Sequence, residues 1–594
     1  MSQMDRVHFF PVIVWVIFLL IVWYLLLIAF IIPNYYKVLR SRRLWENFMV
    51  SIIIESEHLL VILKDYFAIW SKEILKVCKL LIIVKFSKNN LERIEKKMYT
   101  EDVENINDIG YVFKVSDDIV YARGLLKVQM SEMVKITLKT GEVMFGIVNY
   151  LDNEGAAGIT VLGDASGITA NTIVERNFIQ PKIKGGYDVL GRVLSPIGEP
   201  LDGKGPIVDG VELSIEKNAP SIIARKPVRE PLETGIKFID SMIPIGCGQR
   251  ELIIGDKKTG KTSIAIDTII NQKGNDIVCI YVAIGQKKSS IARVAKILNE
   301  RGCLDYVIVV AAGASDSAAL QYLAPYSGCA LGEYYRDLGR KVLLIYDDLS
   351  KHAVAYRQMS LLLRRPPGRE GYPGDVFYIH SRLLERAAKL RDDKIDNLVY
   401  EGGSLTALPI IETIQGDVSA YIPTNVISIT DGQIFLEASL FNRGIRPAIN
   451  PGISVSRVGS SAQNKVIKKL AGSLKLELAQ YREMEEFARL GLSLDESTMY
   501  LLEKGRRLVQ LMNQTNYLPI NMCSQLVLIY CGLEGIFSDV DLENILVFEK
   551  KMLYLLNDES IISIFNSLLR LEFVTDFVLF LVNILKLYLL VETK

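Results

Sequence analysis

The stretch ELIIGDKKTGKT, residues 251–262, decides the fold. It joins a short apolar run to the pattern G-x-x-x-x-G-K-[ST], which ends at Lys261 and Thr262. We expect a strand, a glycine-rich loop and a helix beginning near Lys261, because loop N–H groups and the positive helix end can then surround phosphate oxygens. Lys261 is expected to reach the terminal phosphates, and Thr262 to offer its hydroxyl to Mg²⁺. The stretch therefore predicts a nucleotide-phosphate site.

Apolar runs that resemble the first one follow it along the chain. Residues 277–282, 307–310 and 342–346 are nearly continuous in apolar side chains and alternate with helical patterns. Strands of this kind indicate a parallel sheet covered on both faces. Asp347 is the first residue after the last of these runs, so we expect it to hold Mg²⁺ through water.

The regions on either side of this α/β segment have other patterns. Short β-prone runs at 111–115, 134–138, 144–148 and 158–162 are separated by Gly and Asp turns, which predicts a small closed barrel. The barrel has no stripe of aromatic and basic residues, so a structural role is favoured over nucleic-acid binding. Beyond about Ser461 the chain reads as mostly helical.

The N-terminal end predicts a membrane helix. The 21 residues from Val12 to Ile32 carry no charge, which is the length that a helix needs to cross the hydrocarbon layer. A cleaved signal peptide and a buried core helix are the alternatives. Basic residues follow the span, so the long C-terminal part is expected on the cytoplasm-like side. Residues 44–104 predict amphipathic helices, either an ordinary connecting pair or a pair that binds a membrane surface or a partner.

Composition agrees with a soluble body that carries a membrane segment. The chain has 594 residues, with 69 Lys+Arg against 68 Asp+Glu, and a formal charge of +1. This balance argues against a nucleic-acid binder driven by net positive charge. Charged residues make up 23% of the chain, which is too many for a membrane channel, although the mean hydropathy of +0.23 is high for a soluble enzyme.

Binding a nucleotide does not by itself imply hydrolysis. Hydrolysis needs a group that orients or deprotonates water, usually a carboxylate at the end of the strand next to the phosphate loop. We expect residues 277–284 to form that strand, and Gln286 stands at its end. An amide has no useful basicity, so we expect the site to bind nucleotide and turn it over poorly or not at all. The alternative is a glutamine that orients water, as in some GTPases.

Four motifs together resemble the alpha-subunit family of the rotary ATP synthase: GQRELIIGD (248–256), YDDLSK (346–351), RRPPGRE (364–370) and PAINPGISVSR (447–457). The resemblance runs from about residue 105 to the C-terminus. It implies a β-barrel at 105–183, a RecA-like nucleotide-binding domain at 184–462 and a helical domain at 463–594, preceded by the one transmembrane helix. Three alpha subunits would alternate with three catalytic beta subunits around a central-stalk gamma subunit, and peripheral-stalk subunits would complete the complex.

The resemblance also implies roles for single residues. That family carries glutamine where beta carries its catalytic glutamate, which makes the site of Gln286 non-catalytic. Arg457 matches the arginine that alpha inserts into the neighbouring beta site, where it would serve as an arginine finger for ATP synthesis from ADP and phosphate. Thr262 and Asp347 would face Mg²⁺. The residues implied to bind ATP or ADP are Asp256, Lys257, Lys258, Thr259, Gly260, Lys261, Thr262, Ser263, Gln286, Arg446, Pro447, Gln514 and Asn516.

Two places depart from the family pattern. Lys257 and Lys258 stand where the family usually has Arg-Gln, which adds positive charge beside the phosphates. Asn516 replaces the second of two glutamines expected near the adenine, whereas Gln514 matches the first. We therefore expect nucleotide binding to persist with altered base selectivity.

The first residues carry a second resemblance. Met1, Gln3, Asp5, Phe10 and Trp15, followed by the span and its basic end, are similar to mitochondrial ATP synthase subunit 8. Residues 1–43 would then anchor the chain in the mitochondrial inner membrane, with the body on the matrix side. A complex has three alpha subunits and one subunit 8, so the expected product is either cleaved or present as three anchored copies.

Two other functions remain open from the residues alone. One is a catalytic homo-hexameric P-loop ATPase of the secretion-motor type, which would hydrolyse ATP at its own site. The other is a Rho-like RNA translocase, although the balanced charge and the plain barrel argue against nucleic acid as a partner.

Overall fold

The computed structural model describes residues 109–556, apart from gaps at 126, 153–154, 393, 396–397, 400–401, 490–494, 538–541 and 543. The predicted membrane span at 12–32 and the amphipathic connector at 44–104 lie outside the described residues. Among the helices that are described, none combines the length and the apolar character needed to cross a membrane.

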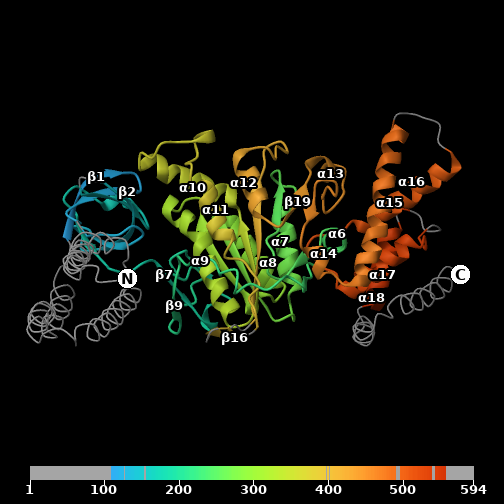
Figure 1. Ribbon diagram of the computed structural model, residues 1–594, viewed down its shortest axis with the longest axis horizontal. Coiled ribbons are helices and arrows are strands. Elements are labelled where there is room, and N and C mark those ends of the chain that lie inside the picture. Colours follow the sequence, from blue (N-terminus) through green and yellow to red (C-terminus); the bar gives the residue numbers. More distant parts are fainter. Residues whose placement is uncertain are drawn as a thin grey trace, which may run out of the picture. The chain divides into compact units, whose positions relative to one another are not determined.

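The predicted barrel is confirmed. In the described part of the chain, six strands close into a barrel in the order β1-β2-β5-β4-β3-β6, with antiparallel neighbours throughout (Figure 1, blue). Alternate side chains such as Val112, Val120 and Ile159 fill the interior. The strands are β1 (Ile109–Ser116), β2 (Ile119–Arg123), β3 (Met133–Thr137), β4 (Val143–Leu151), β5 (Ala156–Val161) and β6 (Ile173–Arg176). The sequence patterns had not indicated β2 and β6.

The predicted parallel sheet is also confirmed. Eight of the described strands form it in the order β20-β19-β12-β18-β15-β13-β14-β8, and only β20 is antiparallel to its neighbour. The strands are β8 (Val193–Leu194), β12 (Leu252–Gly255), β13 (Ile277–Gln286), β14 (Val307–Gly313), β15 (Lys341–Asp347), β18 (Ser404–Glu412), β19 (Gly432–Leu436) and β20 (Val455–Ser456). One expectation is wrong: β13 does not neighbour the phosphate-loop strand β12, because β18 and β15 lie between them.

Helices cover both faces of this sheet (Figure 1). Along β13 the side chains alternate, so that Val278, Ile280 and Val282 join the core cluster of one face, while Cys279 and Tyr281 join that of the other. The first cluster takes in helices α9 (Ala318–Asp337), α10 (Leu349–Leu362), α11 (Val376–Leu384) and α12 (Tyr421–Ile429). The second takes in α6 (Lys237–Met242), α7 (Lys261–Asn271) and α8 (Lys288–Glu300). This two-sided burial explains why the strands are apolar at nearly every position.

Short elements connect these parts. The small strands are β7 (Lys182–Gly185), β9 (Val211–Ser214), β10 (Pro231–Leu232), β11 (Ile245–Gly246), β16 (Lys394–Ile395) and β17 (Leu398–Val399). The short helices are α13 (Ala438–Asn442) and α14 (Gly459–Ala462), with 3-10 turns at Ala165–Gly167, Tyr187–Val189, Leu304–Tyr306 and Arg369–Gly371.

The C-terminal part is helical, as predicted. It contains α15 (Lys465–Arg489), α16 (Glu496–Met512), α17 (Met522–Leu533) and α18 (Ile545–Leu556), which share a small apolar core. Leu474, Leu508 and Ile529 from these helices also belong to the second core cluster of the sheet. The apolar interior is therefore continuous between the sheet and the helical part.

A buried lysine strengthens this junction. Lys237 of α6 is fully buried, and its Nζ donates to the Leu511 carbonyl oxygen at 2.5 Å and to that of Asn513 at 3.0 Å, both at the C-terminal end of α16. The same Nζ lies 2.5 Å from the Glu549 carboxylate of α18. The Lys237 ammonium group thus caps the last turn of α16 and forms an ion pair with Glu549 of α18.

A second buried ion pair holds α9 against the chain that follows α11. Arg386 donates from Nε to Glu333 Oε1 at 3.0 Å and from Nη2 to Oε2 at 2.6 Å, and both side chains are 1% exposed. Its Nη1 also donates to the Ile215 carbonyl oxygen at 3.0 Å. The guanidinium is therefore paired on both edges, as a buried cation must be.

Replacing Glu333 by alanine should lower the free energy of unfolding by about 3–5 kcal/mol, because the Arg386 guanidinium would stay buried without its partner. Urea unfolding of the full chain, followed by circular dichroism, measures the change. The matched control is Glu212→Ala, which removes the partner of Lys182 from an exposed pair at 2.9 Å and should leave the unfolding midpoint unchanged. Equal effects of the two substitutions would contradict the assigned role of burial.

Candidate functional site

The phosphate loop follows β12 and precedes α7, in the order that the sequence predicts. Gly260, at the N-cap of α7, has φ = 105°, a left-handed conformation that glycine adopts without steric cost. At Gly255 a Cβ atom would lie 2.6 Å from the Leu436 carbonyl oxygen, so the close approach of β12 to β19 leaves no room for a side chain. The loop is therefore shaped by these two glycines.

Asp256 joins the loop to the segment that follows β18. Its Oδ1 accepts hydrogen bonds from Thr413 Oγ1 at 2.7 Å and from the Gly416 N–H at 2.8 Å. Thr259 Oγ1 donates to the Asp256 carbonyl oxygen at 2.8 Å. Lys257 is turned outward, with Nζ 3.7 Å from the Glu412 carboxylate. Asp256 and Lys257 are thus not among the residues that line the adjoining cavity.

The predicted magnesium ligands and Gln286 meet around Asp347. Its Oδ2 accepts hydrogen bonds from Thr262 Oγ1 at 2.8 Å and from the Tyr281 hydroxyl at 2.7 Å. Gln286 Nε2 donates to the Asp347 carbonyl oxygen at 3.1 Å. The next residue, Asp348, caps α10 by accepting from the Lys351 N–H at 2.7 Å, and burial raises its pKa to about 6. Oxygen donors from Thr262 and Asp347 form the kind of ligand set that suits Mg²⁺.

Lys261 lies against the loop itself. Its Nζ donates to the carbonyl oxygens of Gly255 at 2.9 Å and of Asp256 at 2.5 Å. Burial lowers the pKa of Lys261, while the neighbouring carboxylates of Glu412 and Asp347 act in the opposite direction. The ammonium group is therefore held at the start of α7, where phosphates bind in loops of this type.

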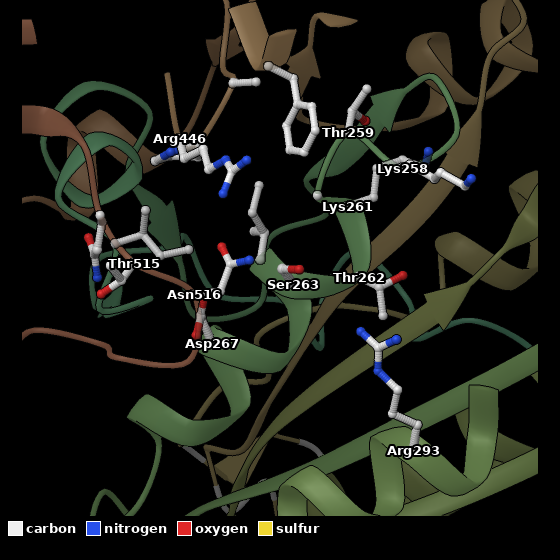
Figure 2. Close-up of a pocket in the computed structure, with 17 residues that line it drawn as sticks. Lys258, Thr259, Lys261, Thr262, Ser263, Asp267, Arg293, Arg446, Thr515 and Asn516 are labelled. Atoms are coloured by element: carbon white, nitrogen blue, oxygen red, sulfur yellow. The ribbon is translucent and has the colours of Figure 1, made fainter. Parts of the chain in front are cut away.

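A cavity of about 310 Å³ opens beside the loop. Figure 2 shows Arg446 on one side of it, and Lys258 and Arg293 on the other. The lining brings together ten of the predicted nucleotide-binding residues with seven that were not predicted. The first set is Lys258, Thr259, Gly260, Lys261, Thr262, Ser263, Arg446, Pro447, Gln514 and Asn516; the second is Ile236, Ile264, Asp267, Arg293, Phe441, Ala448 and Thr515.

The charge of the lining suits a polyanion. Among the described residues that line the cavity, the cationic side chains are Lys258, Lys261, Arg293 and Arg446, and the acidic one is Asp267. The Arg446 guanidinium lies over the Phe441 ring, 5.0 Å from its centroid. A cationic end next to an aromatic and aliphatic wall fits a ligand that has both phosphates and a flat ring.

Asp267 is an unexpected acid in this cavity. It stands one turn after Ser263 on α7, near Asn516 (Figure 2), and is 6% exposed. Burial raises its pKa to about 7, and its Oδ1 has no hydrogen-bond partner within the described chain. Helical periodicity counted from Ser263 could have found it, whereas no signal near Arg293 or Phe441 in the sequence points to the site.

Gln514 is less available than the sequence suggested. Its Oε1 accepts from the Lys237 N–H at 3.0 Å, and its Nε2 donates to the carbonyl oxygens of Gly235 at 2.8 Å and of Leu518 at 2.9 Å. The amide thus holds the start of α6 against the loop at 514–518. In this conformation the Gln514 side chain forms a wall of the cavity, and both of its amide ends are engaged with backbone.

Arg457 lies away from the cavity. It follows the edge strand β20, its side chain is exposed, and its N–H donates to the Asp431 carbonyl oxygen at 3.0 Å. The structure therefore places ten of the predicted nucleotide-binding residues around the cavity and leaves Arg457 away from it. Outside the cavity lining, but close to the loop or to the end of β15, lie Asp256, Lys257, Gln286 and Asp347.

Matches to known proteins extend over most of the chain. The nucleotide-binding domain of the ATP synthase alpha/beta family matches residues 235–456, and the C-terminal domain of the ATP synthase alpha/beta chain matches residues 463–575. The chain is 54% identical over 459 residues to ATP synthase subunit alpha of Aquifex aeolicus (strain VF5), a match that spans 77% of this chain and 89% of that protein. The chain belongs to the ATP synthase alpha subunit family.

Proposed function

We propose that this chain is a non-catalytic, nucleotide-binding alpha subunit of the rotary ATP synthase. It would hold ATP or ADP in its own cavity as a regulatory ligand and supply Arg457 to the catalytic site of an adjacent beta subunit. The reaction of the complex would be the synthesis of ATP from ADP and phosphate, driven by protons.

Gln286 carries the proposal that the site is non-catalytic. Its amide nitrogen donates to the Asp347 carbonyl oxygen at 3.1 Å, so the side chain stands beside the strand end that also presents the Thr262–Asp347 pair. Activation of water there requires a group that accepts a proton, and an amide cannot do so. The position beside Asp347 does not depend on β13 neighbouring β12, because the carboxyl ends of parallel strands share one edge of the sheet.

Lys261, the loop N–H groups and the start of α7 support binding of the phosphates. Lys258 and Arg293 add positive charge at the same end of the cavity, while Phe441, Arg446 and Asn516 surround its other parts. Mg²⁺ bound by Thr262 and Asp347 would neutralise phosphate charge. Because Gln514 is engaged with backbone and Asn516 is short, contacts to the base would come mainly from the apolar wall, which favours loose base selectivity.

Arg457 supports a role outside the chain's own cavity. An exposed guanidinium at the end of an edge strand can enter a neighbouring subunit, where it would stabilise charge on the transferring phosphoryl group. Beta subunits would flank this chain in an alternating hexamer, around a gamma subunit and beside peripheral-stalk subunits. Nucleic acid is not expected as a partner.

The assignment of the first 104 residues comes from the sequence: the uncharged run at 12–32 predicts a membrane helix, and the resemblance to subunit 8 covers residues 1–43. We propose that residues 1–43 form a subunit-8-like membrane segment in the mitochondrial inner membrane, with the body of the chain on the matrix side. Residues 44–104 would connect this segment to the body. The proposed domain limits at 183–184 and 462–463 likewise come from the sequence.

The purified chain should bind ATP and hydrolyse it at a negligible rate. Lys261→Ala should weaken ATP binding by about 10–100-fold, because a charge-assisted contact to phosphate is lost. Calorimetric titration measures binding, and phosphate release measures turnover. Rapid hydrolysis by a homo-hexamer of this chain would contradict the proposal in favour of a secretion-type motor, and hydrolysis stimulated by RNA would favour a Rho-like translocase.

Arg457→Ala should lower ATP hydrolysis by the assembled complex about 10³-fold or more, which is the range known for arginine fingers. Nucleotide bound at the Lys261 site should be retained, as measured by the nucleotide content of the purified complex. The matched control is Arg506→Ala, which removes an exposed arginine from α16 and should leave the rate unchanged. An unchanged rate in Arg457→Ala would refute the assignment of the finger.

Mass spectrometry of the native complex decides the fate of the N-terminus. If the chain is processed, the alpha-like polypeptide should begin near residues 90–105, and residues of the 12–32 span should occur in a separate small protein. If three anchored copies are present, peptides from both regions should occur in one polypeptide of 66.8 kDa. Absence of the 12–32 region from the membrane complex would refute both forms of the anchor.

A further inference from the structure

The strand that precedes Arg457 is held weakly by its own ladder. β20 pairs with β19 only through Gly432–Ser456 and Gln433–Val455, at the edge of the sheet. Two residue pairs fix little of a strand's direction, and a side chain that must reach another subunit needs a defined direction. Contacts beyond this ladder must therefore orient Arg457.

A series of hydrogen bonds between polar side chains provides such contacts. Gln249 is 1% exposed, and its Nε2 donates both to Glu251 Oε2 at 2.7 Å and to Ser456 Oγ at 3.1 Å. Its Oε1 accepts from the Gly246 N–H at 2.8 Å. Ser456 Oγ in turn donates to the Pro244 carbonyl oxygen at 2.7 Å. The residue immediately before Arg457 is thus tied to the segment that leads into β12.

The Glu251 carboxyl group lies beside the pairing of β19 with β20. Its side chain is fully buried, and a Cβ atom added at Gly432 would lie 2.5 Å from Glu251 Oε2 and 2.3 Å from the Val455 carbonyl oxygen. The carboxyl group therefore fills the space where β19 and β20 meet. With the Glu251 carboxyl group in this position, no residue larger than glycine fits at 432.

The backbone of Arg457 is fixed from a second direction. Its N–H donates to the Asp431 carbonyl oxygen at 3.0 Å, and the Asp431 carboxylate binds Arg250 through Nε at 3.1 Å and Nη2 at 2.9 Å. Arg250 Nη1 also reaches the Glu385 carboxylate at 2.5 Å. Gln249, Arg250 and Glu251 are consecutive in sequence, so both supports of the arginine originate in the three residues before β12.

Burial and the Arg457 charge act on the pKa of the Glu251 carboxyl group in opposite directions. Burial raises the pKa of Glu251 well above its usual value, the Asp431 charge raises it further, and the Gln249 hydrogen bond and the Arg457 charge act in the opposite direction. Glu251 Oε1 has no hydrogen-bond partner among the residues that the structure describes.

We propose that Gln249 and Glu251 are positioning residues that act through Ser456 to set the direction in which Arg457 leaves this chain. The inference rests on the proposed finger role of Arg457. Neither residue lies in the nucleotide cavity of its own chain, so each would act on catalysis only through the arginine.

A double-mutant cycle in the assembled complex tests the proposal. Gln249→Met keeps the length of the side chain and removes the amide that binds Glu251 and Ser456. Glu251→Leu removes the carboxyl oxygen that accepts the hydrogen bond from Gln249. Each should lower kcat for ATP hydrolysis about tenfold, leave KM unchanged, and leave the nucleotide content at the Lys261 site unchanged. In an Arg457→Ala background, measured with concentrated complex, neither should lower the residual rate further. Either variant that assembles is sufficient for the test.

Glu251→Gln serves as the conservative control, because an amide keeps the shape of the side chain and its oxygen can still accept a hydrogen bond from Gln249. It should retain kcat close to that of the unmodified complex. The proposal is overturned if Gln249→Met or Glu251→Leu leaves kcat unchanged, or if it lowers the rate by the same factor with and without Arg457. If Arg457→Ala itself has no effect, the proposed function of the arginine fails first. The two failures are therefore distinguishable.

Discussion

The hydrogen bond from Thr262 to Asp347, 2.8 Å long, is the interaction on which the arrangement of the site depends. It joins the first turn of the helix after the phosphate loop to the end of β15, and Tyr281 of β13 donates to the same carboxylate oxygen at 2.7 Å. The parallel sheet makes this meeting possible, because it places all these strand ends at one edge. The two-sided apolar core holds the sheet, but this polar contact fixes the rotation of the loop and its helix over that edge. Gln286 Nε2 donates to the backbone carbonyl oxygen of Asp347, so residues from α7, β13 and β15 all meet at this one aspartate.

Local patterns made the phosphate loop and the sheet class predictable. The glycines at 255 and 260 are needed for a close strand contact and a left-handed turn, so the spacing of the motif carries the geometry directly. Continuous apolar strands report burial on both faces, and short runs between turns report a barrel. Local patterns do not predict the order of strands in the sheet, because that order depends on which strands pair across long connections. The expectation that β13 neighbours β12 was wrong for this reason, yet Gln286 still reaches Asp347, since parallel strand ends share an edge.

The rest of the cavity could not be read from one sequence. Arg293, Phe441 and Thr515 come from three separate elements, and nothing in their own surroundings marks them. Asp267 was within reach of helical periodicity, whereas the outward turn of Lys257 follows from its approach to Glu412 on β18. The resemblance predicted Gln514 near the adenine; the residue lines the cavity, and its amide is engaged by the backbone of Gly235, Lys237 and Leu518. The contacts to Gly235 and Lys237 join residues more than 270 positions apart, which only the folded chain brings together.

The hydrogen bonds of Gln514 and the buried ammonium group of Lys237 connect the cavity to the C-terminal helices. One wall belongs to the sheet domain and another to the loop between the C-terminal helices, and Lys237 ties that loop's helix to Glu549 two helices further on. A ligand that contacts both walls would restrain movement of the C-terminal helices at this joint with the sheet domain. By thermodynamic linkage, any force that tilts the C-terminal helices against the sheet changes nucleotide affinity, and a tightly held nucleotide resists that tilt by the same free energy. Nucleotide binding can thus stiffen this joint, an effect that is separate from any chemistry at the site.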